Sequence, residues 1–562
     1  MAAYLYTLRA AANKPFFFSS SSSSPHSRPE NNQLMSSATA ARNPALAVKA
    51  KATSPAEEPS GSDGGRTRLS AWASVRRERW EGELPVEGQL PPWLNGTYLR
   101  NGPGLWDVGD RTFHHLFDGY ATLVCVSFRQ GHAAGAHRQI VSEAYKAARA
   151  RGRPLHPEFA HCPKPPPAAL LAALLAGGPA AAAAALLPDN PNSAVVPLGD
   201  GRVLCLAESA RSSTLVDPAT LATVGRFPYA DTLGGMAVQA GHPIVDAAAG
   251  EVVTVLPDLA RRGYLVVRME VGSSERKVIG RIGCRGGGLT PGWVHSFAVT
   301  ENFIVVPEMP LRYSPTRLLR SELAEFYAFD WLPASGSYMH VLSRSTGKMV
   351  ASVEVPPFMA MHFINAYEEK RRDDDGQAVA VVVDCCEHYG DPATIHTLDI
   401  HSLRSLQGED VLPDARVGRF RIPLDGSSFG ELEAALDPEQ HGRGMDMCTI
   451  NPAFLGRSYR YAYGCGARRP CNFPNTLAKI DLLEKTAKNW HQDGVVPSEP
   501  LFVARPGTTE EDDGVVISIV STIQGDGYAL VLDGMTFQEI ARVRFPYGLP
   551  YGFHGCWIPE KI

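Results

Sequence analysis

Four histidines stand in similar apolar surroundings although they lie far apart along the chain. They are His242, His295, His362 and His554, separated by 53, 67 and 192 residues, and glycine, proline, aliphatic or aromatic residues adjoin each of them. A lone histidine of this kind is usually a hydrogen-bonded core residue. Four that converge would form a site for iron, copper or zinc, and iron(II) is favoured where coordination positions stay open for dioxygen.

Sequence motifs of the common enzyme classes are absent. There is no GxxxxGK[ST], HExxH or GxSxG motif, and the glycines 286–288 do not fit GxGxxG. The ten cysteines include no CxxC pair, which indicates reduced thiols in a reducing compartment rather than a disulfide framework or a zinc site. The acidic run 510–513 is either a cation-binding loop or a turn, and the following Gly514 favours the turn.

The composition allows a large buried core and argues against nucleic acid as a partner. Of the 562 residues, 44% are hydrophobic and 9% are aromatic. The formal net charge is −5, whereas nucleic-acid-binding domains carry basic surfaces.

The N-terminus has the composition of a targeting segment. No acidic residue precedes Glu30, and a serine run spans residues 19–24. Such acid-poor, serine-rich sequence is typical of organellar transit peptides, and the low arginine content favours the plastid. We therefore expect residues 1–55 to be a plastid transit peptide, 56–68 a linker and 69–562 the catalytic domain. A disordered tail without a targeting role is the alternative.

The segment 165–188 is apolar and uncharged, with a Gly-Gly-Pro interruption at its centre. Neither half is long enough to span a bilayer. It is expected to form two short helices that are either buried or lie in a membrane interface. A structural or disordered alanine-rich insertion is the alternative.

Beyond residue 96 the sequence indicates an all-β fold. Short runs rich in β-branched residues, such as 250–256, 303–308, 378–384 and 514–520, alternate with turn residues. A regular alternation of strands with long helices is missing, which argues against a doubly wound parallel sheet. Many short antiparallel strands need an arrangement that protects their edges, either a propeller or a pair of sandwiches.

Several motifs closely resemble the carotenoid cleavage oxygenase family, in the same order, from about residue 80 to 562. They are Gly96-Thr-Tyr-Leu-Arg-Asn-Gly-Pro103, His115-Leu-Phe-Asp-Gly119, the four histidine segments and the terminal Tyr551-Gly-Phe-His-Gly555. The resemblance implies a seven-bladed β-propeller with a helical and loop dome. It also implies one Fe(II) on the propeller axis, held by His242, His295, His362 and His554, and no side-chain nucleophile.

The same resemblance implies carboxylates behind three of the histidines, which orient the rings and offset the metal charge. They correspond to Glu208, Glu499 and Asp446. Asp446 departs from the family pattern, because it lies in a Gly-Met-Asp-Met-Cys turn and aspartate is one methylene shorter than glutamate. We expect it either to need a water to reach its histidine or to have lost the role.

Finer features resemble the plant branch of the family that forms carlactone in strigolactone biosynthesis. They are the turn at 444–448, the ending 547–554 and the run 490–500. The resemblance implies dioxygen-dependent conversion of 9-cis-10′-apo-β-carotenal by a monomer in the plastid stroma, in peripheral contact with a membrane. Alternatives are cleavage of all-trans-10′-apo-β-carotenal or a 9-cis-epoxycarotenoid, an isomerohydrolase, and a metal-free binding module.

Overall fold

The computed structural model describes residues 70–560 with internal gaps. The gaps are 156–158, 160–174, 176–188, 210–211, 232, 234–237, 286–289, 315–328, 371–377, 406–408 and 439–442. The expected transit peptide and linker lie outside the described residues, as does the apolar segment 165–188 apart from Leu175. What was expected of these segments stays a prediction.

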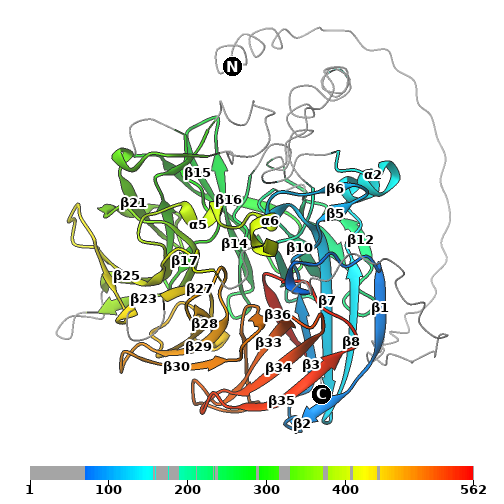
Figure 1. Cartoon of the computed structure of the whole chain (residues 1–562). Coiled ribbons are helices and arrows are strands. Elements are labelled where there is room, and N and C mark those ends of the chain that lie inside the picture. Colours follow the sequence, from blue (N-terminus) through cyan, green and yellow to red (C-terminus); the bar gives the residue numbers. More distant parts are fainter. Residues whose placement is uncertain are drawn as a thin grey trace, which may run out of the picture. The chain divides into compact units, whose positions relative to one another are not determined.

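The described strands form a seven-bladed β-propeller, which confirms the expected fold (Figure 1). Each blade is an antiparallel sheet of four or more strands. The first three blades are β1 (Arg79–Leu84), β8 (His132–Gln139), β7 (Tyr120–Arg129), β3 (Gly96–Arg100) and β36 (Gly555–Pro559) with β4 (Pro103–Leu105); β9 (Ala194–Pro197), β10 (Val203–Leu206), β11 (Thr214–Val216) and β12 (Thr223–Arg226); and β13 (Ile244–Asp246), β14 (Glu251–Asp258), β15 (Gly263–Glu270) and β16 (Arg276–Gly283).

The remaining blades follow in chain order, and two short strand pairs lie outside them. The fourth to seventh blades are β17 (Ala298–Val299), β18 (Phe303–Glu308), β21 (Ser337–Ser343) and β22 (Met349–Val355); β23 (Ala360–Lys370), β24 (Ala378–Glu387), β25 (Arg416–Pro423) and β26 (Glu431–Ala434); β27 (Arg443–Ile450), β28 (Tyr461–Ala467), β29 (Thr476–Asp481) and β30 (Thr486–His491); and β2 (Val86–Gly88), β35 (Glu539–Phe545), β34 (Gly527–Asp533), β33 (Gly514–Thr522) and β31 (Val495–Pro497) with β32 (Leu501–Ala504). The two pairs are β5 (Asp107–Val108) with β6 (Arg111–Thr112), and β19 (Leu311–Tyr313) with β20 (Phe329–Trp331).

Burial explains why these runs form strands. The β-branched run of β33 is buried along its whole length, as expected for a strand covered on both faces. The outer strand β22 has an exposed end at Met349 and buried Val353 and Val355. The hydrophobic core is therefore divided into several clusters of buried side chains, which lie between neighbouring blades.

Both ends of the described chain close the ring. The C-terminal strand β36 pairs with β3, so that Gly96 lies opposite Pro559 and Arg100 lies opposite Gly555. Near the start of the described chain, β2 pairs with β35 of the last blade. In Figure 1 the red C-terminal strands accordingly lie beside the blue N-terminal ones. Segments from the two ends of the described chain therefore complete the first and last blades, and the ring leaves only short, protected sheet edges.

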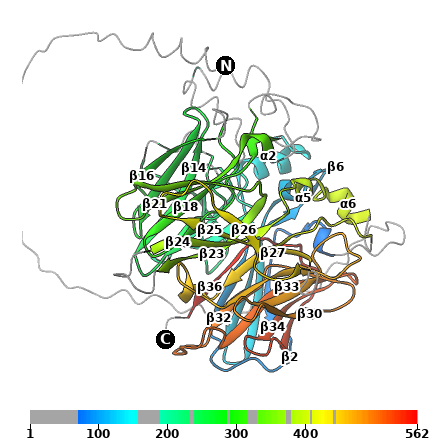
Figure 2. The ribbon, with the colours of Figure 1, turned by 90° about the vertical axis from the view of Figure 1, so that its left-hand side faces the viewer.

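Helices are few and short in the described part of the chain. They are η1 (Ser70–Trp72), η2 (Leu116–Asp118), α2 (Glu143–Arg151), η4 (Pro333–Ser335), α5 (Ala393–His396), α6 (Ile400–Ser405) and η5 (Pro452–Phe454). The helix α6 contacts β5 through Arg404, which pairs with Asp107 at 2.9 Å. Figure 2 shows α6 and β6, the partner strand of β5. No helix among the described residues has the length and apolar character needed to cross a membrane.

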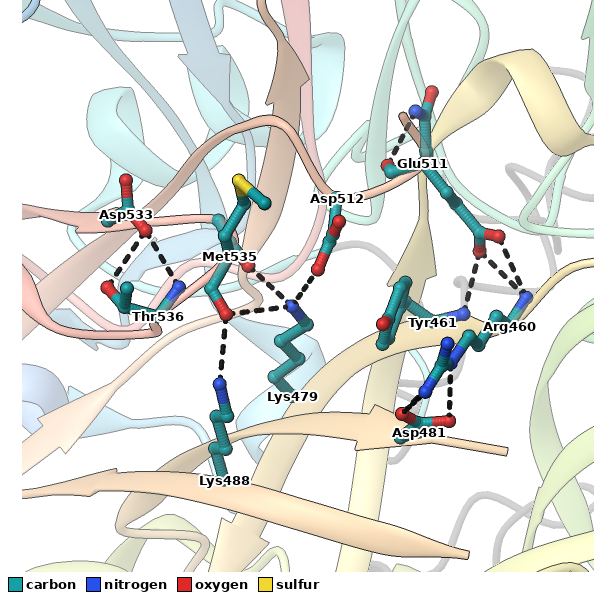
Figure 3. Close-up of polar contacts among 12 residues, drawn as sticks. Arg460, Tyr461, Lys479, Asp481, Lys488, Glu511, Asp512, Asp533, Met535 and Thr536 are labelled. Atoms are coloured by element: carbon teal, nitrogen blue, oxygen red, sulfur yellow. Dashed lines mark hydrogen bonds and ion pairs between the residues drawn. The ribbon is translucent and has the colours of Figure 1, made fainter. Parts of the chain in front are cut away.

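A polar cluster links the sixth and seventh blades (Figure 3). Lys479 on β29 donates to the Asp512 carboxylate and to the backbone carbonyls of Gly534 and Met535. Glu511 accepts the backbone N–H groups of Arg460 and Tyr461. The acidic run 510–513 thus forms a turn whose carboxylates bind neighbouring protein groups, in line with the turn favoured from the sequence.

Candidate metal centre

Each of the four histidines comes from a different place in the ring. His242 lies between β12 and β13, His295 just before β17, His362 within β23, and His554 just before β36. Their side chains belong to the third, fourth, fifth and first blades or to the connections entering them. The propeller thus brings together residues that are distant in the sequence.

The imidazoles converge through their Nε2 atoms. The Nε2–Nε2 distances are 3.1 Å between His242 and His295, 3.3 Å between His295 and His362, and 3.3 Å between His362 and His554. One ligand atom from each residue lies within 4.8 Å of all the others. Neighbouring nitrogens about 2.1 Å from a common ion lie about 3 Å apart, which agrees with the three Nε2–Nε2 distances.

The protonation of the rings explains why this arrangement calls for a cation. Nδ1 of His295 lies 2.6 Å from Glu208, and Nδ1 of His362 lies 2.6 Å from Asp446. A carboxylate accepts hydrogen bonds, so Nδ1 carries the hydrogen and Nε2 presents a lone pair. Lone pairs that face one another at about 3 Å repel unless a cation lies between them. The residues present therefore fit a divalent metal ion.

Burial keeps two of the imidazoles in the ligand form. The pKa of His242 and that of His554 are held well below the usual histidine value, first by burial and then by the neighbouring histidines. Both rings are therefore neutral at working pH, and neutral imidazole is the form that binds a metal.

Each of the three expected carboxylates contacts one histidine directly. Glu208 contacts His295 at 2.6 Å, Asp446 contacts His362 at 2.6 Å, and Glu499 contacts His554 at 2.8 Å. The structure thus places all seven sequence-predicted residues in one cluster. For His242, the described residues supply a backbone bond from its N–H to the His295 carbonyl at 3.2 Å and no carboxylate.

Asp446 reaches its histidine without a water, which corrects both expectations for this residue. The sequence suggested a turn at 444–448, but these residues belong to β27, whose register shifts on both sides of Asp446. Met447 has φ of 54°, a left-handed conformation uncommon for a residue with a side chain. The irregular strand compensates for the shorter side chain.

The two most buried carboxyl groups of the centre differ in charge. Burial raises the pKa of Glu499 to about 8. Burial also acts to raise the pKa of Asp446, but His362 and His388 outweigh it and hold that pKa well below its usual range. Without a metal, Asp446 is therefore ionised at neutral pH while Glu499 is largely protonated.

The centre lies in the wall of a cavity of about 240 Å³ lined mainly by apolar side chains. Contributing side chains include Phe117 of η2, Phe329 of β20, Met361 and Phe553, and Thr394 belongs to α5. Short helices and loops thus cover the cavity, as the expected dome implied. The arrangement can hold a long apolar molecule beside a metal ion.

Sequence reasoning missed several residues that shape this centre. Trp293 donates from Nε1 to Glu208 at 2.7 Å, and His388 donates from Nε2 to Asp446 at 3.2 Å. Gly241 packs against His295, so a Cβ at that position would lie 3.0 Å from Cε1 of the ring. Gly241 and Trp293 could have been found from the sequence, because they lie one and two residues before the predicted ligands His242 and His295.

Comparison with known proteins decides the family. The family profile described as "Retinal pigment epithelial membrane protein" matches residues 72–559. The chain belongs to this family. Its members include carotenoid cleavage dioxygenases, and this carotenoid oxygenase is 70% identical to "Carotenoid cleavage dioxygenase 8 homolog A, chloroplastic" of Oryza sativa subsp. japonica, over 93% of this chain and 94% of the rice protein.

Further relatives agree with that assignment. "Carotenoid cleavage dioxygenase 8, chloroplastic" of Arabidopsis thaliana is 54% identical over 91% of this chain and 90% of its own. A cobalt-substituted Synechocystis ACO matches the fold with a TM-score of 0.71 and 22% identity, over 88% of this chain and 98% of that one. This carotenoid oxygenase is accordingly an oxygen-incorporating oxidoreductase of the carotenoid cleavage dioxygenase class.

Proposed function

We propose that this protein is a non-haem Fe(II) dioxygenase that converts 9-cis-10′-apo-β-carotenal and dioxygen into carlactone, a step of strigolactone biosynthesis. The observation that carries the proposal is the convergence of four Nε2 atoms at the wall of an apolar cavity. The plant relatives named carotenoid cleavage dioxygenase 8 support the choice of substrate and product. The coarser activity, cleavage of a carotenoid or apocarotenoid, follows from the family.

Four neutral histidines suit the proposed chemistry. Because none of them is anionic, they would leave the full charge of a bound divalent ion uncompensated by its ligands, and iron(II) is favoured where coordination positions stay open for dioxygen. Bound Fe(II) would supply the activation of dioxygen beside a conjugated double bond. Glu208, Asp446 and Glu499 orient the rings through Nδ1 and offset part of the metal charge.

The cavity wall selects the substrate under this proposal. Aromatic side chains such as Phe117, Phe329 and Phe553 line the cavity and can pack along a polyene, and an apolar wall of this kind would exclude water from the reacting bond. A 9-cis bend would need a matching bend in the cavity. The shape of the wall, rather than a side-chain acid or base, would then decide which double bond lies beside the metal.

The decisive experiment uses ¹⁸O₂. Iron-loaded protein is incubated with 9-cis-10′-apo-β-carotenal, and the products are identified by mass. Labelled carlactone supports the proposal. Formation of two simple aldehydes would contradict the proposal and support the alternative cleavage activity. Turnover only of the all-trans isomer, or only of a 9-cis-epoxycarotenoid, would do the same. Turnover without label incorporation would favour an isomerohydrolase.

A second experiment tests the metal. Purified protein should carry about one iron per chain, and His362→Ala should lose both iron and activity, because the three remaining imidazoles bind a divalent ion more weakly. His340→Ala is a suitable control, since His340 is also buried but contacts Glu308 and Ser352 away from the cluster. Full activity of His362→Ala would contradict the assignment and favour a metal-free module.

We also propose a plastid stromal enzyme that contacts a membrane. Residues 1–55 would be the transit peptide, 56–68 a linker, and 69–562 a monomeric catalytic domain. The names of the chloroplastic relatives support the location. Import into isolated chloroplasts, followed by N-terminal sequencing, tests the cleavage of the transit peptide. Light scattering tests whether the domain is a monomer. Deletion of residues 165–188 should reduce binding to vesicles of plastid lipids.

A further inference from the structure

His388 lies against the metal centre although it is not one of the four converging histidines. Its Nε2 is 3.2 Å from Oδ2 of Asp446, while Oδ1 of the same carboxylate contacts His362 at 2.6 Å. Because a carboxylate accepts hydrogen bonds, Nε2 of His388 must carry the hydrogen and donate it. His388 is 4% exposed, and its ring lines the same cavity.

The other two carboxylates show what such a second contact does. Glu208 binds His295 through one oxygen and accepts Trp293 Nε1 at 2.7 Å through the other. Glu499 binds His554 through one oxygen and accepts the Gly555 backbone N–H at 2.9 Å through the other. In both cases a second donor fixes the plane of the carboxylate that holds the histidine. At Asp446 the donor to the second oxygen is His388, while the first oxygen, which contacts His362, also accepts the Met447 backbone N–H at 2.8 Å.

The backbone around His388 holds the ring in place. His388 follows the end of β24, its N–H donates to the Met359 carbonyl at 2.8 Å, and its carbonyl accepts the Asp391 N–H at 2.9 Å. His362 and His388 therefore come from the fifth blade, and Asp446 reaches them from β27 of the sixth. The carboxylate joins the two blades beside the proposed metal.

We propose that His388 is a positioning residue of the metal centre: it fixes the Asp446 carboxylate, and through it the His362 ring, while forming part of the cavity wall. The short aspartate, the irregular strand at Met447 and His388 would act as one unit that replaces a longer acid. This inference rests on the four-histidine metal site proposed above.

The first test replaces His388 in the full chain and measures Co(II) binding to the metal-free protein. His388→Phe keeps a ring of similar size but removes the donor, and His388→Gln keeps an N–H donor close to the position of Nε2. We expect His388→Phe to lower Co(II) affinity and kcat/KM about 10- to 100-fold and to change the Co(II) absorption spectrum. His388→Gln should recover most of both, within about threefold of the parent.

The matched control is His340, another buried histidine whose Nε2 is 2.9 Å from a carboxylate, that of Glu308. His340→Phe should leave the Co(II) spectrum and affinity unchanged, whatever its effect on Tm. If His388→Phe binds Co(II) with the parent spectrum and affinity, the positioning role is refuted. If the parent protein itself binds no Co(II), the metal site fails, which is a different outcome.

A double-mutant cycle tests the pairing without relying on His388→Phe. A glutamate at 446 would push its carboxylate toward both rings, since Oδ1 and Oδ2 already contact His362 and His388. We expect Asp446→Glu to weaken Co(II) binding and Asp446→Glu/His388→Ala to bind more tightly than Asp446→Glu alone. Additive losses in the cycle would overturn the proposal.

Discussion

At the scale of single residues, Glu499 and Asp446 do the same work with different charge states. Glu499 has a pKa raised to about 8 because it is buried, whereas the pKa of Asp446 is held well below its usual range once the donors His362 and His388 outweigh burial. A divalent ion bound to His554 would favour the ionised form of Glu499, because the carboxyl group is hydrogen-bonded to that imidazole. Metal binding and the proton on Glu499 are therefore coupled.

This coupling predicts proton release. The pKa of Glu499 is about 8, so its carboxyl group carries a proton at pH 7. Metal binding should therefore release about one proton from it. At pH 9 the carboxyl is already ionised, and the release should fall. Calorimetric Co(II) titrations in buffers of different ionisation enthalpy count these protons. Glu499→Gln should release about one proton fewer at pH 7, and an equal count at both pH values in the parent would contradict the prediction.

Gly241 provides a second residue-scale prediction. A Cβ there would lie 3.0 Å from Cε1 and 3.1 Å from Nδ1 of His295, so Gly241→Ala should shift the ring by a few tenths of an ångström. We expect about a tenfold loss of Co(II) affinity. Gly283→Ala is the control, because a Cβ at that position meets nothing within 4 Å. Equal Co(II) affinity in the two variants would show that the ring tolerates the contact.

The ligands could be predicted from the sequence because each lies in a short motif that resembles the family, such as Phe553 and Gly555 around His554. His388 could not be. Its partner Asp446 is 58 residues away, and nothing local to either residue signals the contact. The reach of Asp446 was misjudged because side-chain length is visible in a sequence, whereas the conformation of Met447 is not.

At the scale of elements, two loops form one wall of the cavity and are held together by Arg469. Its guanidinium donates to Asp410, Asp414 and the Leu412 carbonyl, each at 2.6 Å. The Cys471 carbonyl accepts the N–H of Leu412 at 3.2 Å. Leu412 and Pro413 from one loop, with Phe473 and Pro474 from the other, line the cavity.

Removing this link should affect substrate binding more than the metal centre. We expect Arg469→Gln to raise KM for the apocarotenal about three- to tenfold, as hydrogen bonds to a charged group are lost, with kcat nearly unchanged. Arg505→Gln serves as the control, because Arg505 pairs with the single acid Asp513 at 2.9 Å away from the cavity residues. A fall in kcat or in Co(II) affinity with KM unchanged would refute the role of the two loops.

Strands were predicted better than helices, for a physical reason. The β-branched runs 303–308 and 514–520 correspond to β18 and most of β33, because their residues favour strands both locally and by burial. The helices α5 and α6 span 4 and 6 residues, too short for a helical period to show. The helix α2 did carry usable signals, Ser142 as N-cap and Gly152 at its end in a left-handed conformation.

At the scale of the whole molecule, ring closure and ligand placement depend on one segment. The Phe553 N–H donates to the Asn101 carbonyl at 2.8 Å, and the Asn101 N–H donates to the His554 carbonyl at 2.9 Å. The next residue begins β36, which pairs with β3. The hydrogen bonds that close the first blade therefore also hold His554 in place.

Removing residues 554–562 should for this reason abolish Co(II) binding and lower Tm, since it deletes a ligand and a closing strand together. Lowered stability alone could also reduce metal binding, so a destabilised variant with all four histidines is needed. Lys479→Met is suitable because it breaks the buried contact between the sixth and seventh blades and leaves the metal centre intact. The loss should lower the free energy of unfolding by about 3 kcal/mol or more. We expect it to keep Co(II) affinity within about threefold of the parent below its Tm. If it loses Co(II) as completely as the truncated chain, the centre depends on the integrity of the ring as a whole rather than on the terminal segment.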